Sequence, residues 1–426
     1  MSSIAKLPDL LFSDSKGKVY HHSTLKMVVE SLGKYSLPKG QEIIAMPKGS
    51  TLFYLPGRKP LGFNPQSKKV ELLDKFKGQD VFAVAVFPIP AYLRLHLPVV
   101  KVISKKCLPL WAYTACGFHR GRFVVSAIRV DKRVRQSPWF YDGKRVKEGV
   151  RSFFKRYPKN RLYQHLANCA LNYNCLAAKN LFLQRWEAPL PTARSCNAKC
   201  LGCLSHQEEG LCASHNRISF MPDRDELVEV MSNHLRVAQE AIVSFGQGCE
   251  GEPLLGADSL ARAVVEVRKL TSRGTINMNT NASLPNKIKN LCLAGIDSFR
   301  VSLNSPDKRF YDLYFKPQGY SFSDVLKSIA IAKRYNKFVS INLFVFPGFS
   351  DSTKQIKSLI KLIKNSGIDM IQWRNLNMDP EIYRKIIPTK NVKAQGILYL
   401  LKSIKREFPK LKMGYFNLPK EQFKSF

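Results

Sequence analysis

Acidic residues are scarce in this chain of 426 residues, which carries 32 Asp and Glu against 68 Lys and Arg and so has a formal net charge of +36. A positive field of this size favours polyanions, either nucleic acid or an anionic membrane surface, as partners. A lysine-rich genome would explain many of the lysines but explains the shortage of acids less well. The charge balance therefore favours a nucleic-acid partner, with compositional bias as the alternative.

Long apolar runs are also missing. No stretch reaches the roughly 18 to 20 apolar residues of a transmembrane helix, so we expect no membrane span. Residues 1–18 mix charges into a short apolar stretch, which does not fit a signal peptide. Ten cysteines in a chain of this length fit a reducing compartment better than a disulfide framework. We therefore expect a cytoplasmic protein of two or three domains.

Three of the cysteines stand close together in the stretch Ser195–Leu204, which reads SCNAKCLGCL. Cys196, Cys200 and Cys203 can aim three thiolates at one point, and thiolate is the usual protein ligand of iron–sulfur clusters. No fourth cysteine follows at a familiar spacing, since Cys212 lies further along the chain. Three ligands on a [4Fe–4S] cube leave one iron open, and an open coordination position marks a metal that binds something else.

Two simpler interpretations of this loop stay open. One is a three-cysteine zinc site completed by His206 or His215, and the other is a chance group of buried cysteines. Zinc sites more often show paired C-x-x-C arms, which favours the iron–sulfur interpretation. Both histidines are otherwise expected to be exposed loop residues.

The spacing C-x-x-x-C-x-x-C resembles the signature of the radical S-adenosylmethionine (SAM) enzymes. The resemblance implies a [4Fe–4S] cluster whose open iron chelates the amino and carboxylate groups of SAM. It further implies that an electron from a partner such as flavodoxin or ferredoxin splits SAM to a 5′-deoxyadenosyl radical. One departure is Gly202, because that family usually has an aromatic residue there, packed near the adenine.

From about residue 182 the sequence alternates between strand and helix patterns, which predicts parallel βαβ units. Six strands are expected, at 182–190, 241–245, 274–279, 298–303, 338–346 and 370–375. Helices are expected at 223–240, 258–272, 285–294, 323–335, 352–366 and 392–407. Six units make a partial (β/α)6 TIM-like barrel, an α/β fold that is also the radical SAM core. The cysteine loop follows the first strand, at the rim where barrels place their chemistry.

The later rim loops continue the resemblance over roughly residues 190–378. Gly251, Glu252 and Pro253 resemble the family motif G-G-E-P, with Glu250 in place of its first glycine. The resemblance implies that backbone carbonyls and the carboxylate here receive the ammonium group of SAM, and glycine lets the backbone approach closely.

Polar residues at the later strand ends are the remaining expected SAM contacts. The stretch from Asn279 is similar to the family's T-N-G turn, and RVSLNSP (residues 300–306) resembles its ribose-contacting strand. Serine and asparagine offer both the donors and the acceptors that a diol requires. Taken singly, each position would be a helix cap or a satisfied strand end. The expected contacts are Asn279, Asn281, Ser302, Asn304, Ser340, Asn342, Gln372 and Arg374.

The sequence offers few candidate residues for chemistry beyond SAM cleavage. Cys249, inside the SAM-binding loop, and Cys212, just after the cluster loop, are predicted as hydrogen donors or covalent relays, with small apolar fillers as the alternative. Four further cysteines have spacings unlike common metal-binding arms and are expected to be small buried residues: Cys107, Cys116, Cys169 and Cys175.

Composition divides the chain into three expected parts. Residues 1–180 form a basic α+β domain, 181–383 the radical SAM core, and 384–426 a helix with a basic tail that covers the open side of the barrel. In the first part, Arg129–Arg161 holds twelve Lys and Arg interleaved with six aromatic residues. Cations beside flat rings suit single-stranded RNA or a splayed loop. A solvated helix face with its aromatics packed inward is the alternative.

The sequence therefore predicts a radical SAM enzyme whose substrate is RNA, either tRNA or rRNA. A peptide-modifying or activating radical SAM enzyme is the first alternative. The chain has no cysteine-rich C-terminal extension of the kind found in peptide-maturing subfamilies and no cobalamin motif. A nucleic-acid-binding protein with a structural or redox-sensing cluster is the second alternative.

Overall fold

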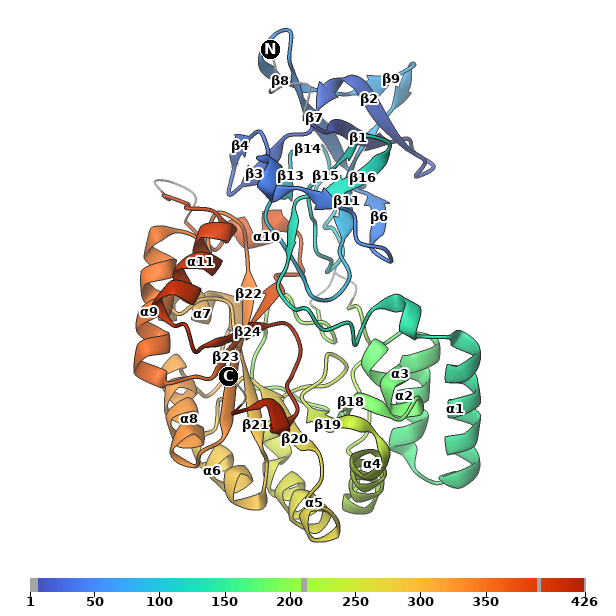
Figure 1. The fold of residues 1–426 in the computed structure, drawn as a ribbon, viewed down its shortest axis with the longest axis vertical. Coiled ribbons are helices and arrows are strands. Elements are labelled where there is room, and N and C mark those ends of the chain that lie inside the picture. Colours follow the sequence, from blue (N-terminus) through green and yellow to red (C-terminus); the bar gives the residue numbers. More distant parts are fainter. Residues whose placement is uncertain (1–6, 208–212, 389–391, 425–426) are drawn as a thin grey trace.

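The computed structural model describes residues 7–207, 213–388 and 392–424. A sheet-rich N-terminal part lies above a curled parallel sheet that is surrounded by helices (Figure 1). Within these described ranges no helix is long and apolar enough to cross a membrane.

The N-terminal part is mostly antiparallel sheet. Its main sheet has ten strands, with β1 at the centre between β2, β11 and β15. The proline-containing region 87–98 includes two short strands. The strands are β1 (Asp9–Ser13), β2 (Val19–Lys26), β3 (Val29–Ser31), β4 (Lys34–Ser36), β5 (Ile44–Ala45), β6 (Thr51–Tyr54), β7 (Arg58–Asn64), β8 (Lys69–Leu72), β9 (Lys75–Phe76), β10 (Gln79–Asp80), β11 (Phe82–Phe87), β12 (Tyr92–Arg94), β13 (Leu97–Pro98), β14 (Val100–Val102), β15 (Cys116–His119), β16 (Arg122–Val125) and β17 (Ala127–Arg129).

Three helices follow, and they pack against the lower part of the molecule rather than the antiparallel sheet (Figure 1). They are α1 (Gly143–Arg156), α2 (Arg161–Leu171) and α3 (Leu176–Phe182). The segment 161–184 forms two helices rather than one, because Asn174 between them has φ 55°, and a left-handed residue ends a right-handed helix. Helix α2 begins where Asn160 accepts from the backbone N–H groups of Leu162 and Tyr163, as an N-cap does.

The lower part is a half-barrel of seven parallel strands in the order in which they occur in the chain. The six expected strands are all present. The seventh, β24, comes from the tail and has three residues, too few to show a sequence pattern. The strands are β18 (Arg185–Pro189), β19 (Gln239–Phe245), β20 (Thr275–Thr280), β21 (Ser298–Leu303), β22 (Phe338–Val345), β23 (Met370–Asn375) and β24 (Lys412–Gly414).

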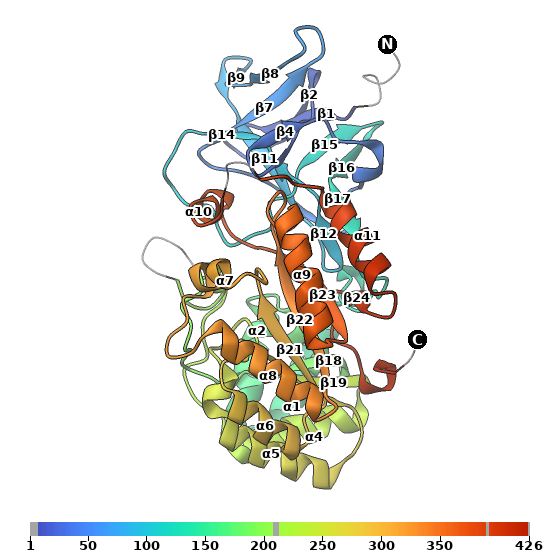
Figure 2. The same ribbon diagram turned by 90° about the vertical axis from the view of Figure 1, so that its left-hand side faces the viewer.

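Helices cover the outer face of this half-barrel, and Figure 2 shows α9 and α11 side by side on it. Each of the six expected helices is found within a few residues of its expected ends. Two further helices, α7 and α10, were not expected. The helices are α4 (Arg224–Val237), α5 (Ala257–Leu270), α6 (Pro285–Ala294), α7 (Lys308–Phe315), α8 (Phe322–Arg334), α9 (Thr353–Ser366), α10 (Pro380–Arg384) and α11 (Ile397–Glu407).

The inner face of the half-barrel is polar. On β21, Arg300 and Ser302 alternate with the buried apolar residues Phe299, Val301 and Leu303. Successive side chains of a strand point to opposite faces, so the apolar set packs under the helices and the polar set faces inward. The register carries this pattern across the sheet: Arg300 pairs with Ser340, Ser302 with Asn342, and Asn342 with Gln372.

The N-terminal sheet is fixed to the carboxyl end of β23. The side chain of Asn375 accepts from the backbone N–H of Arg94 at 2.9 Å and donates to the carbonyl of Tyr92 at 3.0 Å. Arg94 is fully buried and donates to the carbonyl of Leu376 at 2.8 Å. The N-terminal part therefore sits on the rim of the barrel, beside the loop that follows β23.

The C-terminal tail enters the barrel and contacts its strands from inside. The amide of Asn417 donates to Glu187 of β18 at 2.7 Å and accepts from Gln372 of β23 at 2.8 Å. It also lies 3.4 Å from the side-chain oxygen of Asn279 on β20. One tail residue thus contacts three strands from inside.

Candidate active site

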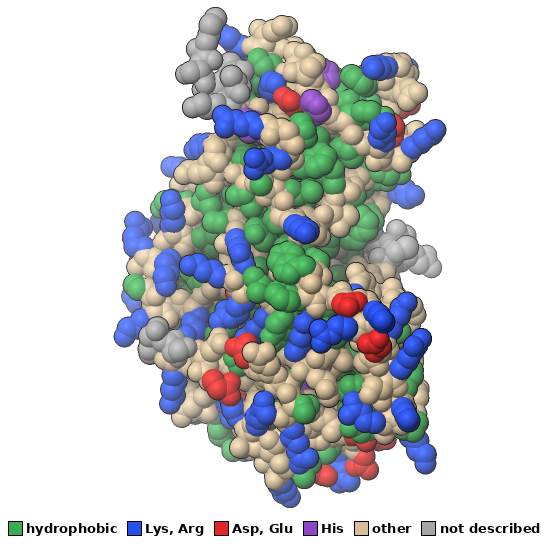
Figure 3. Space-filling view, turned by 45° about the vertical axis from the view of Figure 1, so that its right-hand side comes forward, with side chains coloured by type: hydrophobic (Ala, Val, Ile, Leu, Met, Phe, Trp, Pro, Cys, Tyr) green, Lys and Arg blue, Asp and Glu red, His purple; other side chains and the backbone are tan. Residues whose placement is uncertain are grey.

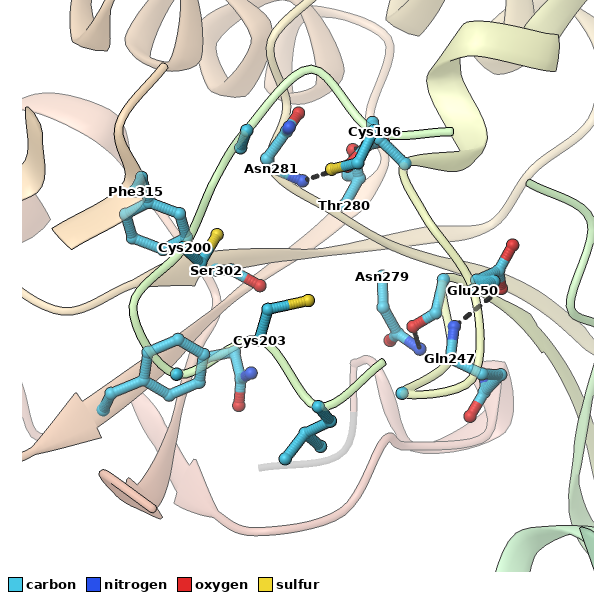
Figure 4. A pocket seen from close by; sticks show the side chains of 18 of the residues that line it. Cys196, Cys200, Cys203, Gln247, Glu250, Asn279, Thr280, Asn281, Ser302 and Phe315 are labelled. Atoms are coloured by element: carbon cyan, nitrogen blue, oxygen red, sulfur yellow. Dashed lines mark hydrogen bonds between the residues drawn. The ribbon is translucent and has the colours of Figure 1, made fainter. Parts of the chain in front are cut away.

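The three loop cysteines line one cavity of about 330 Å³ at the carboxyl ends of the strands. In Figure 4, Cys196, Cys200 and Cys203 come from one loop and surround the same open space. Within the described residues, only a different group of side chains is close enough to share a single metal ion. The wider spacing of the loop cysteines therefore favours a cluster over a three-cysteine zinc site.

The cluster loop is held by backbone hydrogen bonds to two neighbouring loops. The N–H of Gly251 donates to Ala193 at 2.7 Å, and that of Glu252 to Ser195 at 2.9 Å. A Cβ atom on residue 251 would lie 1.8 Å from the carbonyl oxygen of Ser195. Only glycine permits this approach, so the G-E-P motif also serves to pack the SAM loop against the cluster loop.

Glu250, where the family has glycine, braces this junction. Its buried carboxylate accepts from the backbone N–H groups of Thr192 at 2.7 Å, Ala193 at 3.0 Å and Gln247 at 2.7 Å. Burial raises the pKa of Glu250 to about 7, and these hydrogen bonds oppose the shift. The carboxylate therefore holds the start of the cluster loop to the end of β19.

Glu252 joins the SAM loop to β20. It accepts from the hydroxyl of Thr280 at 2.5 Å and from the backbone N–H groups of Asn281 at 2.8 Å and Leu254 at 3.1 Å. Burial raises the pKa of Glu252 to about 7 against the effect of these hydrogen bonds. Its carboxylate still lines the cavity, as the expected acceptor for an ammonium group would.

Most of the expected SAM contacts meet at this cavity. Besides the three cysteines, its lining includes Gly251, Glu252, Pro253, Asn279, Asn281, Ser302, Asn342 and Arg374.

Three expected contacts lie elsewhere. The amide of Asn304 donates to the carbonyl of Phe310 and to Tyr383, so it fixes α7. Ser340 and Gln372 are one layer deeper on their strands, buried, and 3.5 Å from each other. None of the three lines the cavity. The sequence shows which residue types lie near the strand ends, but it does not show how deep in the barrel each side chain lies.

The cavity wall holds polar groups without a partner in the described residues. These buried atoms are Nε of Arg300, Nε of Arg374, Oδ1 of Asn342 and Oδ1 of Asn377. A buried polar group without a hydrogen bond costs free energy, so the cavity suits a ligand that supplies both donors and acceptors. The ammonium, carboxylate and ribose hydroxyls of SAM fit this requirement.

Two arginines near each other make the far wall positive. Burial and the nearby charge of Arg374 lower the pKa of Arg300 to about 9. Arg374 itself stacks on Tyr415, with its guanidinium carbon 3.7 Å from the ring centroid. An anionic group bound here would offset the repulsion between the two guanidinium groups. Arg300 was not predicted to line the site. Its place between the apolar residues of β21 is the signal that could have shown that it faces inward.

An aromatic ring missing from the cysteine loop is supplied by α7. A Cβ atom on residue 202 would lie 2.7 Å from the hydroxyl of Tyr314, so the ring of Tyr314 takes the space beside Gly202. Tyr314 and Phe315 both line the cavity. The end of α7 also contacts the cluster loop, since the backbone N–H of Leu201 donates to the carbonyl of Tyr314 at 3.0 Å.

The three loop cysteines are half-buried, in surroundings that disfavour thiolates unless a cation is bound. Burial raises the pKa of Cys196 to about 11 and raises that of Cys200 as well, and the neighbouring thiols add to both shifts. Thiolates form in such surroundings when a positive metal compensates the charge. Arg217 contributes a further positive charge, with Nη2 3.6 Å from the sulfur of Cys203.

Of the two cysteines predicted for further chemistry, the structure describes only Cys249. Cys249 is buried and is not among the cavity-lining residues. Cys212 lies outside the described residues. The role of each stays a prediction. His206 is exposed as expected, whereas His215 is half-buried.

The sequence of residues 190–363 matches the profile of the radical SAM superfamily. This chain carries a radical SAM domain. Such domains use a [4Fe–4S] cluster and SAM, and the donor set of the cavity fits both groups. Cys196, Cys200 and Cys203 would hold the cluster, and the rim residues that line the cavity would hold SAM.

Several known proteins are similar to parts of the chain. An uncharacterized protein of Methanocaldococcus jannaschii is 28% identical over 173 residues, which cover 35% of this chain and 59% of that protein. SuiB of Streptococcus suis, in complex with its precursor peptide SuiA, has 17% identity and a TM-score of 0.38, with 58% of this chain and 50% of SuiB covered. Methylornithine synthase has 14% identity and a TM-score of 0.38, with 63% and 77% covered. The chain thus spans about half to three quarters of these proteins.

Proposed function

We propose that this protein is a radical SAM enzyme that cleaves SAM reductively and directs the 5′-deoxyadenosyl radical to an RNA substrate. The observation that carries the first half is the meeting of the three cysteines, the G-E-P loop and the polar strand ends at one cavity. When bound, the cluster and SAM would supply the electron transfer and the radical. The chain supplies binding, orientation and exclusion of water.

Opposite charges are distributed to suit SAM. Glu252 lies on the side of the cysteine loop, while Arg300 and Arg374 lie on the wall formed by β21 and β23. Glu252 offers an acceptor for the ammonium group, and the arginines offer donors for a carboxylate or for a phosphate of the substrate. Ser302 and Asn342, paired across β21 and β22, offer both functions to the ribose hydroxyls.

We expect two parts of the chain to limit the access of water to the barrel. The N-terminal sheet is fixed on the rim through Arg94 and Asn375, and Asn417 closes the barrel from below. A radical held in such a cavity is protected from side reactions with solvent.

The RNA half of the proposal is supported by the surface of α1 and the segment before it. Lys144, Arg145 and Lys147 are exposed, while the apolar face of the helix is buried through Val146 and Val150. On the face that Figure 3 presents, Lys and Arg side chains far outnumber Asp and Glu. Cations arranged in this way suit a phosphate backbone.

Aromatic side chains accompany these cations. Trp139 is 55% exposed and Phe154 40% exposed, whereas Phe153 packs inward. The inward-packing alternative therefore holds for Phe153 but not for the other two. Exposed rings beside cations can stack on unpaired bases, which favours RNA with an open loop.

The first test is 5′-deoxyadenosine release by the anaerobically reconstituted, reduced protein, with and without total RNA from the same cells. Release that rises with RNA supports the whole proposal. If RNA does not change the release, the radical chemistry is supported but the RNA substrate is not, and a peptide becomes the substrate to test. A cluster whose electron paramagnetic resonance spectrum does not change on adding SAM would overturn both in favour of a structural or redox-sensing cluster.

The surface of α1 is tested by reversing its charge. The triple variant Lys144→Glu, Arg145→Glu and Lys147→Glu is expected to weaken RNA binding and to flatten its dependence on salt. The matched control reverses three exposed lysines of α9, Lys357, Lys361 and Lys364, which lies on the opposite side of the barrel. Equal losses in both variants would show a general charge effect and remove the specific role of α1.

A further inference from the structure

A second group of metal-ligating side chains lies outside the cavity. His165 and Cys169 of α2 meet Cys249 of the SAM loop, and their ligand atoms all lie within 4.8 Å of one another. Cys169 and Cys249 are buried. Cys249 lies 80 residues after Cys169 in the chain, so the group cannot be recognised from the spacing of its residues in the sequence.

The distances suit one ion rather than a cluster. His165 and Cys169 are four residues apart on α2, which places them on the same face one turn apart. Nε2 of His165 is 3.6 Å from the sulfur of Cys169. Ligands at zinc–nitrogen and zinc–sulfur distances of about 2.1 and 2.3 Å in a tetrahedron lie about 3.5 Å apart, which agrees with this separation. A [2Fe–2S] centre with two histidines would place histidine and cysteine on different irons and further apart.

His215 lies next to this group, outside the set of three whose ligand atoms lie within 4.8 Å of one another, and is the candidate for the fourth ligand. Its Nδ1 is buried and has no hydrogen-bond partner in the described residues. The imidazole lies near enough to Cys169 for the two groups to interact electrostatically, and its ring packs against Tyr173 with centroids 5.9 Å apart. The backbone of His215 donates to Leu204 at the end of the cluster loop, at 3.0 Å.

We propose that Cys169, Cys249, His165 and His215 bind one Zn²⁺ ion. Two thiolates and two imidazoles form a closed tetrahedral set of the kind found in structural zinc sites. Binding displaces the two thiol protons to solvent and involves no change of oxidation state.

The position of the site defines what the ion does. Cys249 lies directly before Glu250 and Gly251, the residues that fasten the SAM loop to the cluster loop. Its carbonyl also accepts from Ile218 at 2.8 Å. A metal bound to Cys249 therefore fixes the SAM loop to α2 and to the segment that leaves the cluster loop. The ion holds the SAM loop and takes no part in the reaction.

The test separates this metal from the cluster. The full-length variant Cys196→Ala, Cys200→Ala, Cys203→Ala removes the cluster ligands, and its zinc content is measured after purification and dialysis against a weak chelator. We expect about one zinc per chain. We also expect Co²⁺, added to the metal-free protein, to give the thiolate charge-transfer absorption of a tetrahedral site. Less than about a tenth of an ion per chain, with no cobalt absorption, would overturn the proposal.

Ligand variants are compared in the same background. Cys169→Ser and Cys249→Ser are each expected to lower the zinc content at least tenfold, whereas Cys292→Ser, at another buried cysteine, keeps it. His215→Ala is a milder change on a half-buried ring and is expected to weaken zinc binding while the far-ultraviolet circular dichroism stays the same. Zinc that persists in both serine variants, or a disulfide between Cys169 and Cys249 found by mass spectrometry in the anaerobically purified protein, would contradict the site. These results do not depend on SAM cleavage or on RNA.

Discussion

Arg58 and Asp379 form a buried ion pair at 3.1 Å that joins the N-terminal sheet to the radical SAM domain, with only 3% and 2% of the two side chains exposed. The same carboxylate accepts from the backbone N–H of Leu108 at 2.9 Å and caps α10 through Glu381. Asp379 therefore collects contacts from both parts of the molecule just beyond β23, next to the cavity wall.

Arg58→Ala is expected to destabilise the protein by about 3–5 kcal/mol, because it leaves the Asp379 charge buried without its partner. Urea unfolding measures the change. Arg224→Ala is the control, since its pair with Asp225 is exposed and is worth less than about 1 kcal/mol. Similar losses in the two variants would show that the buried pair carries no special weight.

Gly251→Ala is expected to weaken SAM binding at least about tenfold while the iron content changes little. The new Cβ would meet the carbonyl of Ser195 at 1.8 Å and push the SAM loop away from the cluster loop. Equilibrium dialysis with labelled SAM measures the affinity. Gly256→Ala serves as control, because its Cβ comes no closer than 3.9 Å to Met221. Unchanged SAM affinity in the first variant would show that the two loops can separate without effect.

His234 is expected to make the protein sensitive to acid. Its Nε2 donates to the carbonyl of Trp186 at 2.8 Å, and complete burial lowers the pKa of this histidine to about 4 from 6.5. The folded state thus disfavours the proton that the unfolded state accepts. The contribution is present above pH 6.5 and is lost as the pH falls toward 4, by about 3 kcal/mol in all.

The matching variant for this prediction is His234→Gln, which keeps an N–H donor for Trp186 but does not titrate. Unfolding free energies at pH 7, 5.5 and 4.5 are expected to fall more steeply for the wild type than for the variant. Parallel pH profiles would place the acid sensitivity elsewhere.

Cys200→Ala is expected to abolish assembly of the [4Fe–4S] cluster, because two thiolates remain where three are needed. Iron and sulfide analysis after anaerobic reconstitution measures the loss. Cys292→Ala, at a buried cysteine of α6, is expected to keep full iron content. Normal iron in the Cys200 variant would remove it from the ligand set.

The barrel was predictable because its strands and helices are long and regular. The six expected strands from β18 to β23 appear near their predicted limits, since short apolar runs alternate with amphipathic helices. The three-residue strand β24 and the helix α7 escaped, because the first is too short for a periodic pattern and the second follows a rim loop. The aromatic ring that α7 places beside Gly202 escaped with it.

Residues at fixed positions in a motif could be predicted to line the cavity. Residues whose contact depends on how deep they lie along a strand could not. Gly251 and Asn281 stand at fixed places after their strands and reach the cavity, whereas Gln372 and Ser340 lie one layer below it. Cys169 was expected to be a small buried residue because its spacing from other cysteines is unlike that of metal-binding arms, and Cys249 was predicted to be a hydrogen donor or relay. These two cysteines come from different segments, so only the fold brings them together.

The contacts of Asn417 have a consequence for biosynthesis. Its amide is the partner that Gln372 of β23 and Glu187 of β18 find at the bottom of the barrel. The ribosome makes Asn417 after strands β18 to β23. Gln372 and Glu187 therefore gain this partner only when the segment that follows β23 has been synthesised and has folded back into the barrel.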